Sequence, residues 1–181
     1  MMTVTETRVL KLRIYGIDDL DPIAVYLEDF GPGQGKVVLT CSDDSWSRYW
    51  SHMGEKTDIR AFLLEAGEHY LVRKFAPGLD PTETDYDSIV DHTRSKILGM
   101  RQLGELSKEQ ARKYWDEAEG LADIADNNLL QEHYGELLWD VFGDEWWYCL
   151  PTQPNYKYEY LVHIINTVKV ALMMLPGREG K

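Results

Sequence analysis

The chain has 181 residues, 31 acidic against 19 basic side chains, a formal net charge of −12, and 44% hydrophobic and 12% aromatic residues. This length and apolar content support a buried core and exclude global disorder. The negative charge argues against direct binding to nucleic acid or to an anionic membrane surface.

The N-terminal third predicts a small antiparallel sheet. Val9–Tyr15 alternates apolar and basic residues, as a half-buried strand does. Ile23–Phe30 and Lys36–Cys41 are two further β-rich segments, joined by the glycine-rich connector Gly31–Gly35. A short connector of this composition predicts a hairpin, and therefore three strands in all.

Helical periodicity follows the sheet. A first helix that ends at Gly54 is predicted from apolar residues spaced i, i+3, i+4 and i+7, namely Trp46, Tyr49, Trp50 and Met53. Two short helices are expected next, over Thr57–Ala66 and Glu68–Phe75, and then a linker, Ala76–Pro81. Longer helices are expected over residues 85–102, 108–126, 129–142 and 158–175.

These elements predict an α+β fold with a three-stranded sheet in residues 1–76 and a helical region in residues 82–181, which can pack together as one domain. No apolar segment reaches the ~20 residues of a membrane span, and the N-terminus lacks the apolar region of a signal peptide. Cys41 and Cys149 lie far apart in the chain and are expected as free thiols. We therefore expect a cytoplasmic protein with no membrane association.

Residues 114–156 carry ten acidic side chains and no lysine or arginine. In the helix expected from residue 108, an apolar stripe is formed by Trp115, Ala118, Ala122, Ala125 and Leu129. An acidic stripe beside it comprises Asp116, Glu119, Asp123 and Asp126. In the next helix the apolar stripe is Leu130, Tyr134, Leu137 and Val141, and the acidic line is Glu132, Glu136 and Asp140, extended by Asp144 and Glu145.

This acidic face has three interpretations: a solvated surface, a docking surface for a basic partner, or a cation site. The spacing of an EF-hand is absent, so no metal is expected. Mimicry of nucleic acid is a specific form of docking. An i, i+4 row places one charge per ~6 Å, against ~1.7 Å along duplex DNA, so mimicry requires paired acidic helices or a homodimer.

Aromatic residues follow the acidic helices. Trp146, Trp147 and Tyr156 are candidate anchors for a partner, and the alternative is that these aromatic residues seal the last helix onto the core. The five histidines form no paired-ligand motif, and no nucleophile motif is present, so neither a catalytic site nor a cofactor is expected.

Several segments of the chain look familiar: Leu20–Ile23 with Tyr26–Phe30, the Trp46–Gly54 segment, Glu68–Leu71, Phe142–Tyr148, Leu150–Thr152 and Pro154–Asn155. Together they resemble an uncharacterised family of accessory proteins from temperate phages and prophages of enteric bacteria. The resemblance carries no catalytic residues. It implies a small acidic protein that acts in a bacterial host and blocks a host factor, such as a defence nuclease or its regulator.

The leading hypothesis is a non-enzymatic protein whose acidic face inhibits or modulates a basic host protein involved in defence or in handling nucleic acid. Its rivals are a small-molecule sensor with a pocket between the sheet and the helix of Trp46 and Trp50, an enzyme, and a structural oligomer. An aromatic-lined cavity would favour the sensor, a cleft with converging titratable groups the enzyme, and the mass in solution the oligomer.

Overall fold

The structure, a computed structural model, describes residues 2–55 and 57–176. Two compact units are present: the first combines Met1–Pro81 with Tyr156–Lys181, and the second is Thr82–Asn155. The second unit is thus inserted into the sequence of the first. The sequence pattern predicts the last helix as part of the helical region, whereas the structure groups it with the sheet, because that helix supplies the sheet's core.

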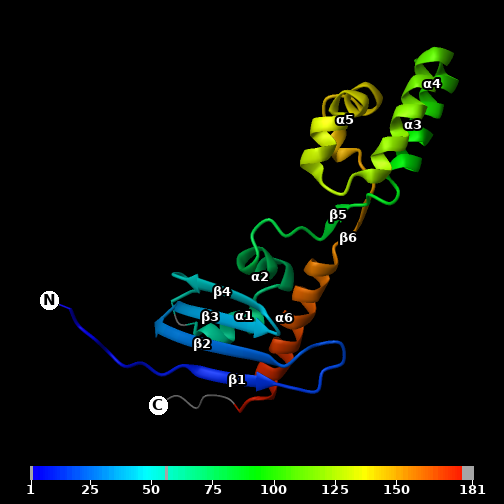
Figure 1. Cartoon of the computed structure of the whole chain (residues 1–181). Coiled ribbons are helices and arrows are strands. Elements are labelled where there is room, and N and C mark those ends of the chain that lie inside the picture. The colour runs from blue at the N-terminus through cyan, green and yellow to red at the C-terminus, as the bar shows by residue number, and fades with distance from the viewer. Residues whose placement is uncertain (1, 56, 177–181) are drawn as a thin grey trace. The chain divides into compact units, whose positions relative to one another are not determined.

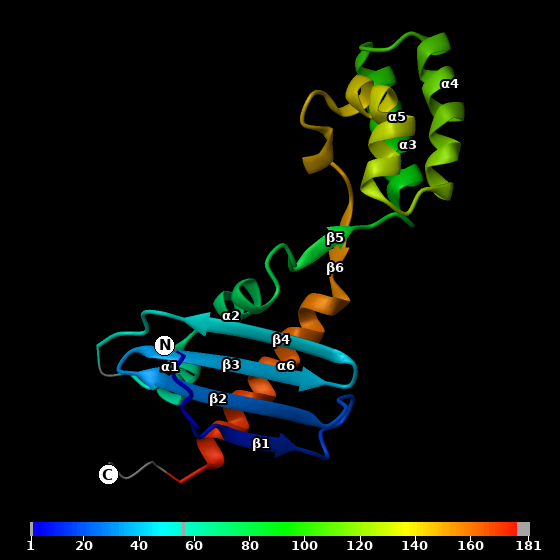
Figure 2. The same ribbon diagram turned by 60° about the vertical axis from the view of Figure 1, so that its left-hand side comes forward.

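A four-stranded antiparallel sheet forms one layer of the first unit. Its strands are neighbours in chain order: β1 (Leu10–Ile14), β2 (Ile23–Gly31), β3 (Gln34–Cys41) and β4 (Asp44–Trp50). Two-residue turns join the last three strands, and Gly33 in the first turn has a φ of 70°, which glycine adopts without steric cost. One face of the sheet is covered by α1 (Ile59–Glu65), α2 (Glu68–Phe75) and α6 (Tyr156–Met174) (Figures 1 and 2).

The α+β class is confirmed, but the prediction of three strands is wrong, because the segment expected as the first helix is strand β4. Trp46 and Trp50 are four residues apart, a spacing that places them on one face of a helix and equally on one face of a strand. In β4, Trp50 is buried and its ring contacts Phe62 and Phe75, at centroid distances of 5.4 and 5.7 Å. These contacts join the edge of the sheet to α1 and α2. The helices predicted over residues 57–66 and 68–75 are confirmed as α1 and α2.

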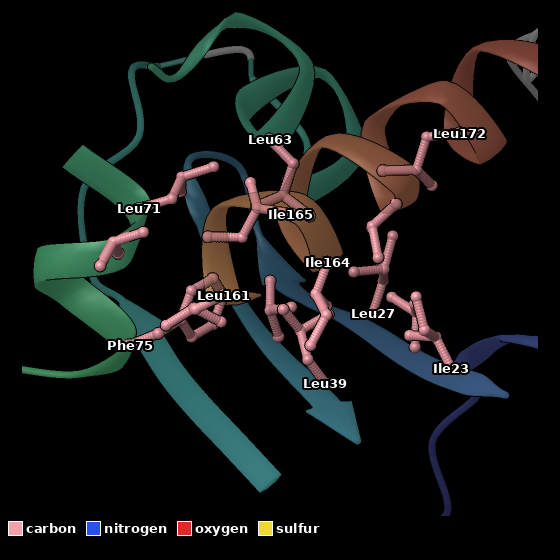
Figure 3. Close-up of a cluster of buried hydrophobic side chains, with 14 of the residues drawn as sticks. Ile23, Leu27, Leu39, Leu63, Leu71, Phe75, Leu161, Ile164, Ile165 and Leu172 are labelled. Atoms are coloured by element: carbon pink, nitrogen blue, oxygen red, sulfur yellow. The ribbon is translucent and has the colours of Figure 1, made fainter. Parts of the chain in front are cut away.

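Helix α6 supplies the centre of the first unit's core. Figure 3 shows its side chains between the strands and the two short helices. The cavity left between them measures about 10 Å³, room for one water molecule at most. Buried residues of α6 are Leu161, Ile164, Ile165, Val168 and Leu172, and the strands contribute Ile23, Val25, Leu27, Val37, Leu39 and Cys41.

Arg60 of α1 caps the end of α6. Its guanidinium donates hydrogen bonds to the carbonyl oxygens of Leu172 and Leu175, both at 2.7 Å, and of Pro176 at 2.9 Å. The last carbonyls of a helix have no partners within the helix, and a cation there also interacts favourably with the helix dipole. We expect Arg60→Ala to lower the free energy of unfolding by about 1–2 kcal/mol in chemical denaturation.

Arg48 provides the matched control. It is an exposed arginine of the same unit, and no hydrogen bond of its side chain is found within the described residues. Arg48→Ala should change the free energy of unfolding by less than about 0.5 kcal/mol. Equal losses from the two variants would show that the capping bonds contribute nothing beyond the loss of an arginine.

The second unit is helical and its two ends are paired. Strands β5 (Thr82–Thr84) and β6 (Thr152–Pro154) form a short antiparallel ribbon, which the sequence analysis did not predict. Between them lie α3 (Ile89–Leu103), α4 (Lys108–Glu117), the 3-10 helix η1 (Ala118–Asp123), α5 (Asn127–Phe142) and the 3-10 turn η2 (Trp146–Tyr148). Its own core contains Ile89, Ile97, Leu106, Ala118, Leu121, Leu130, Leu137, Leu138, Val141, Trp146 and Leu150.

The helix predicted over residues 108–126 is shorter in the structure. Helix α4 begins with a capping box formed by Ser107 and Gln110, as predicted, but it ends at Glu117 and the chain continues as η1. The change of helix type alters which residues face inward. Ala118 and Leu121 are buried, whereas Ala122, Ala125 and Leu129, predicted as part of a buried stripe, are exposed.

Candidate functional site: an acidic hollow in the second unit

The second unit carries nearly all of the chain's excess negative charge. Residues 82–155 contain 16 acidic and 6 basic side chains, a net of −10, while the other segments contain 15 acidic and 13 basic ones, a net of −2. A surface of one sign attracts partners of the opposite sign and raises their rate of association. We therefore expect an electrostatic binding site on the surface of the second unit.

The acidic line predicted on the second helix is present on α5. Glu132, Glu136 and Asp140 are exposed and follow one another at intervals of four residues, so they share a helix face. Asp144 and Glu145 are also exposed but do not extend the line. Helix α5 ends at Phe142, and Gly143 with a φ of 90° turns the chain away from the helical path.

The other acidic stripe, predicted over residues 116–126, is not continuous. Asp116 forms an ion pair with Arg112 at 3.0 Å, and Glu119 forms one with Arg94 of α3. Asp126 is the N-cap of α5, where its carboxylate accepts hydrogen bonds from the backbone N–H groups of residues 128 and 129 at 2.7 and 3.3 Å. Three of these carboxylates therefore stabilise the fold. Asp123 is exposed at the end of η1.

A hollow of about 620 Å³ lies over the acidic line of α5. Its walls hold four carboxylates, one of which, Glu117, comes from the end of α4; the lining residues are Glu117, Gln131, Glu132, His133, Gly135, Glu136, Trp139 and Asp140. We call this feature the acidic hollow. Within the part of the chain that the structure describes, Glu132 and Glu136 make no ion pair with a lysine or arginine. Their charge is available to a partner.

The acidic hollow contains an aromatic side chain that the sequence analysis did not select. Trp139 is 55% exposed and lines the hollow, so part of its indole ring is accessible to a partner. Across the helix pair, the Tyr114 hydroxyl of α4 donates a hydrogen bond to the Asp140 carboxylate at 2.7 Å. This bond holds Asp140 in place and raises the pKa of Tyr114, because the hydroxyl proton is held by the carboxylate.

Two of the three predicted aromatic anchors are accessible. Trp147 is 49% exposed, and Tyr156, in the first unit, is 73% exposed and stacks on Tyr160 with ring centroids 6.2 Å apart. Trp146 is 4% exposed and belongs to the core of the second unit. Its ring is enclosed by that core, so it is not accessible to a partner.

The pocket expected for a small-molecule sensor is filled. The segment expected to enclose it as a helix is strand β4, and a cavity of about 10 Å³ lies among side chains of β3, α1, α2 and α6. A separate hollow of about 500 Å³ lies on the first unit against α2 and α6, lined by His69, Pro81, Tyr158, Glu159, Val162, His163 and Asn166. In it, Nδ1 of His69 lies 2.5 Å from the Tyr158 hydroxyl oxygen.

No group of three or more histidine, cysteine, aspartate or glutamate side chains in residues 2–55 and 57–176 is arranged to hold a metal ion. In the same ranges, no helix combines the length and the apolar composition that a membrane crossing requires.

The chain matches the model of a known protein family. The model of a phage family, Phage_phiTE_072, matches residues 2–174, which covers both units. No curated protein and no solved structure matches the chain.

Proposed function

Because the chain belongs to the phage family Phage_phiTE_072, we propose that it is an accessory protein that binds a basic protein of the bacterial host. Binding through the acidic hollow would inhibit or modulate the target, a factor in host defence or in the handling of nucleic acid. The protein acts in the host cytoplasm and by binding alone, without catalysis or a cofactor.

The observation that supports this proposal is the gathering of four carboxylates around one concave surface. Like charges four residues apart destabilise a helix by a few tenths of a kcal/mol per pair when no cation lies between them. Helix α5 is destabilised in this way by repulsion among Glu132, Glu136 and Asp140. A cationic partner would turn this repulsion into attraction. Concave surfaces lined by one sign of charge also concentrate the field more than flat ones.

The spacing of the charges indicates what kind of basic surface fits. Along α5 one carboxylate follows another every ~6 Å, and Glu117 adds a fourth from α4. Duplex DNA presents one charge per ~1.7 Å, so the hollow imitates at most a short stretch of phosphates. The proposal is therefore contact with a local cluster of basic side chains, such as one site in a nucleic-acid-binding groove, and a homodimer would be needed to cover a longer one.

Affinity purification from an enteric bacterial lysate tests the proposal. The wild-type protein should retain a basic partner at low salt and lose most of it near 1 M salt, where the Debye length falls to about 3 Å. A variant that combines Glu132→Lys, Glu136→Lys and Asp140→Lys should retain at least about tenfold less of the same partner. Mass spectrometry identifies the partner and quantifies its recovery.

A charge-matched control distinguishes an effect of the carboxylates in the hollow from an effect of the net charge of the second unit. Asp87, Glu105 and Glu109 are exposed carboxylates of the second unit that lie outside the hollow. Their replacement by lysine changes the net charge equally and should leave recovery of the partner near that of the wild type. If both triple variants lose the partner equally, or neither does, the hollow is not the binding site.

A further inference from the structure

Gly135 lies in the middle of α5 and on the wall of the acidic hollow. Glycine inside a helix costs stability, because it loses more backbone freedom than alanine, and a close packing contact is the usual compensation. At Gly135 no such contact is present: a Cβ atom would meet only the end of the Gln131 side chain, 3.2 Å from its Nε2. Gln131 is exposed and can move aside.

The absence of a side chain at position 135 opens the hollow. Gln131, Gly135 and Trp139 follow one another at intervals of four residues and so form a row on α5 next to the acidic line. In this row no side chain is attached between Gln131 and Trp139, and only the mobile amide end of Gln131 lies beside Gly135. Any larger side chain at 135 would occupy the space between the half-exposed indole and the carboxylates.

Carboxylates beside an accessible indole select one type of cation. A guanidinium is planar, stacks on aromatic faces and donates paired hydrogen bonds to carboxylates, whereas an ammonium is a compact and strongly hydrated point charge. Arginine is also a frequent anchor of protein interfaces. A volume of about 620 Å³ lies within the range of ~300–1,000 Å³ of ligand pockets, and it accommodates one arginine side chain with water.

We propose that the acidic hollow receives an arginine side chain of the partner, with the guanidinium against Trp139 and the acidic line, in the space that Gly135 leaves open. This inference rests on the proposed function, since it specifies the basic group that the hollow binds.

Short peptides test the inference on the intact protein. Acetylated and amidated tri-arginine and tri-lysine are added to ¹⁵N-labelled protein, and the indole N–H signals are followed by NMR, with Trp139→Phe to assign the signal of Trp139. Tri-arginine should shift that signal and bind about tenfold more tightly than tri-lysine. Equal binding of the two peptides, or no shift of the Trp139 signal, would overturn the inference.

Variants at two glycines show whether weaker tri-arginine binding comes from filling of the hollow or from a change in the stability of the second unit. Gly99 of α3 is also a helical glycine around which a Cβ atom would meet nothing within 4 Å, and it lies outside the hollow. Gly99→Ala and Gly135→Ala should each raise the thermal midpoint of the second unit, by about 4 °C. Only Gly135→Ala, and more strongly Gly135→Leu, should weaken tri-arginine binding; unchanged binding by Gly135→Leu contradicts the inference.

The outcomes for the hollow and for the host partner are distinguishable. If tri-arginine fails to bind while the lysine triple variant still loses a host protein, the arginine site is wrong and the proposed function stands. If tri-arginine binds as expected while no host protein depends on the carboxylates, the arginine site is supported and the proposed function fails.

Discussion

Leu161→Ala is expected to lower the free energy of unfolding of the first unit by about 2–5 kcal/mol. Leu161 is fully buried on α6, where it lies among the side chains between the strands and α2 (Figure 3). Protein cores are close-packed, so loss of the branched side chain leaves a cavity that the surrounding buried side chains cannot fill. Chemical denaturation measures the loss of stability. Hydrogen exchange, measured on peptides from each unit, assigns that loss to the first unit.

Val170→Ala on the same helix is the control. Val170 is 58% exposed, so its truncation should cost less than about 0.5 kcal/mol. If Leu161→Ala cost no more than this control, α6 would not be the central element of the core. If Leu161→Ala lowered the protection of backbone amides from hydrogen exchange equally in both units, the two units would unfold together. Their separate cores predict instead that each unit unfolds independently.

The connectivity of the first unit has a consequence for its folding. Helix α6 follows the whole second unit in the sequence, yet it completes the core of the sheet that precedes that unit. Closing a flexible loop of this length costs entropy. The β5–β6 ribbon holds the two ends of the second unit together, which shortens the effective loop once that unit has folded. Folding of the second unit should therefore favour docking of α6.

The elements predicted correctly are those with sustained periodicity. In α5, Leu130, Leu137 and Val141 face inward as expected, because one apolar stripe runs through about three turns. Strand β4 was missed because aromatic residues four positions apart lie on one face of an α-helix and also on one face of a strand. What decides between the two is pairing with β3, which the local sequence does not show. Strands β5 and β6 have three residues each, too few for any pattern to show.

The candidate site was only partly predictable for a similar reason. Glu132, Glu136 and Asp140 could be placed on one face because they belong to one helix. Glu117 joins them through packing of α4 against α5, which local pattern does not reveal. Two signals were nevertheless available in the sequence: Trp139 lies off the apolar stripe of its helix, and Gly135 interrupts a strong helical segment.

Gly120→Ala is expected to destabilise the second unit, by an amount toward the upper end of the ~1–3 kcal/mol that overpacking costs. A Cβ atom at Gly120 of η1 would lie 2.0 Å from the hydroxyl oxygen of Tyr134 and 2.9 Å from the adjacent ring carbon. Tyr134 is half-buried in α5 and packs against the core, so relief requires moving the ring or separating η1 from α5. Thermal denaturation of the intact protein measures the effect.

Tyr134→Phe tests whether this contact is the cause. Removal of the hydroxyl removes the atom at 2.0 Å but leaves the ring carbon at 2.9 Å, so the double variant should recover part of the stability lost by Gly120→Ala and not all of it. Purely additive effects would show that another contact is responsible.

Gly120 adjoins the segment that carries Glu117, so Gly120→Ala should also weaken tri-arginine binding. Alanine at either glycine should then lower binding, but the effects on stability are opposite: alanine at 120 lowers stability, whereas alanine at 135 raises it. Only a site that keeps a space open at the expense of helix stability produces that contrast.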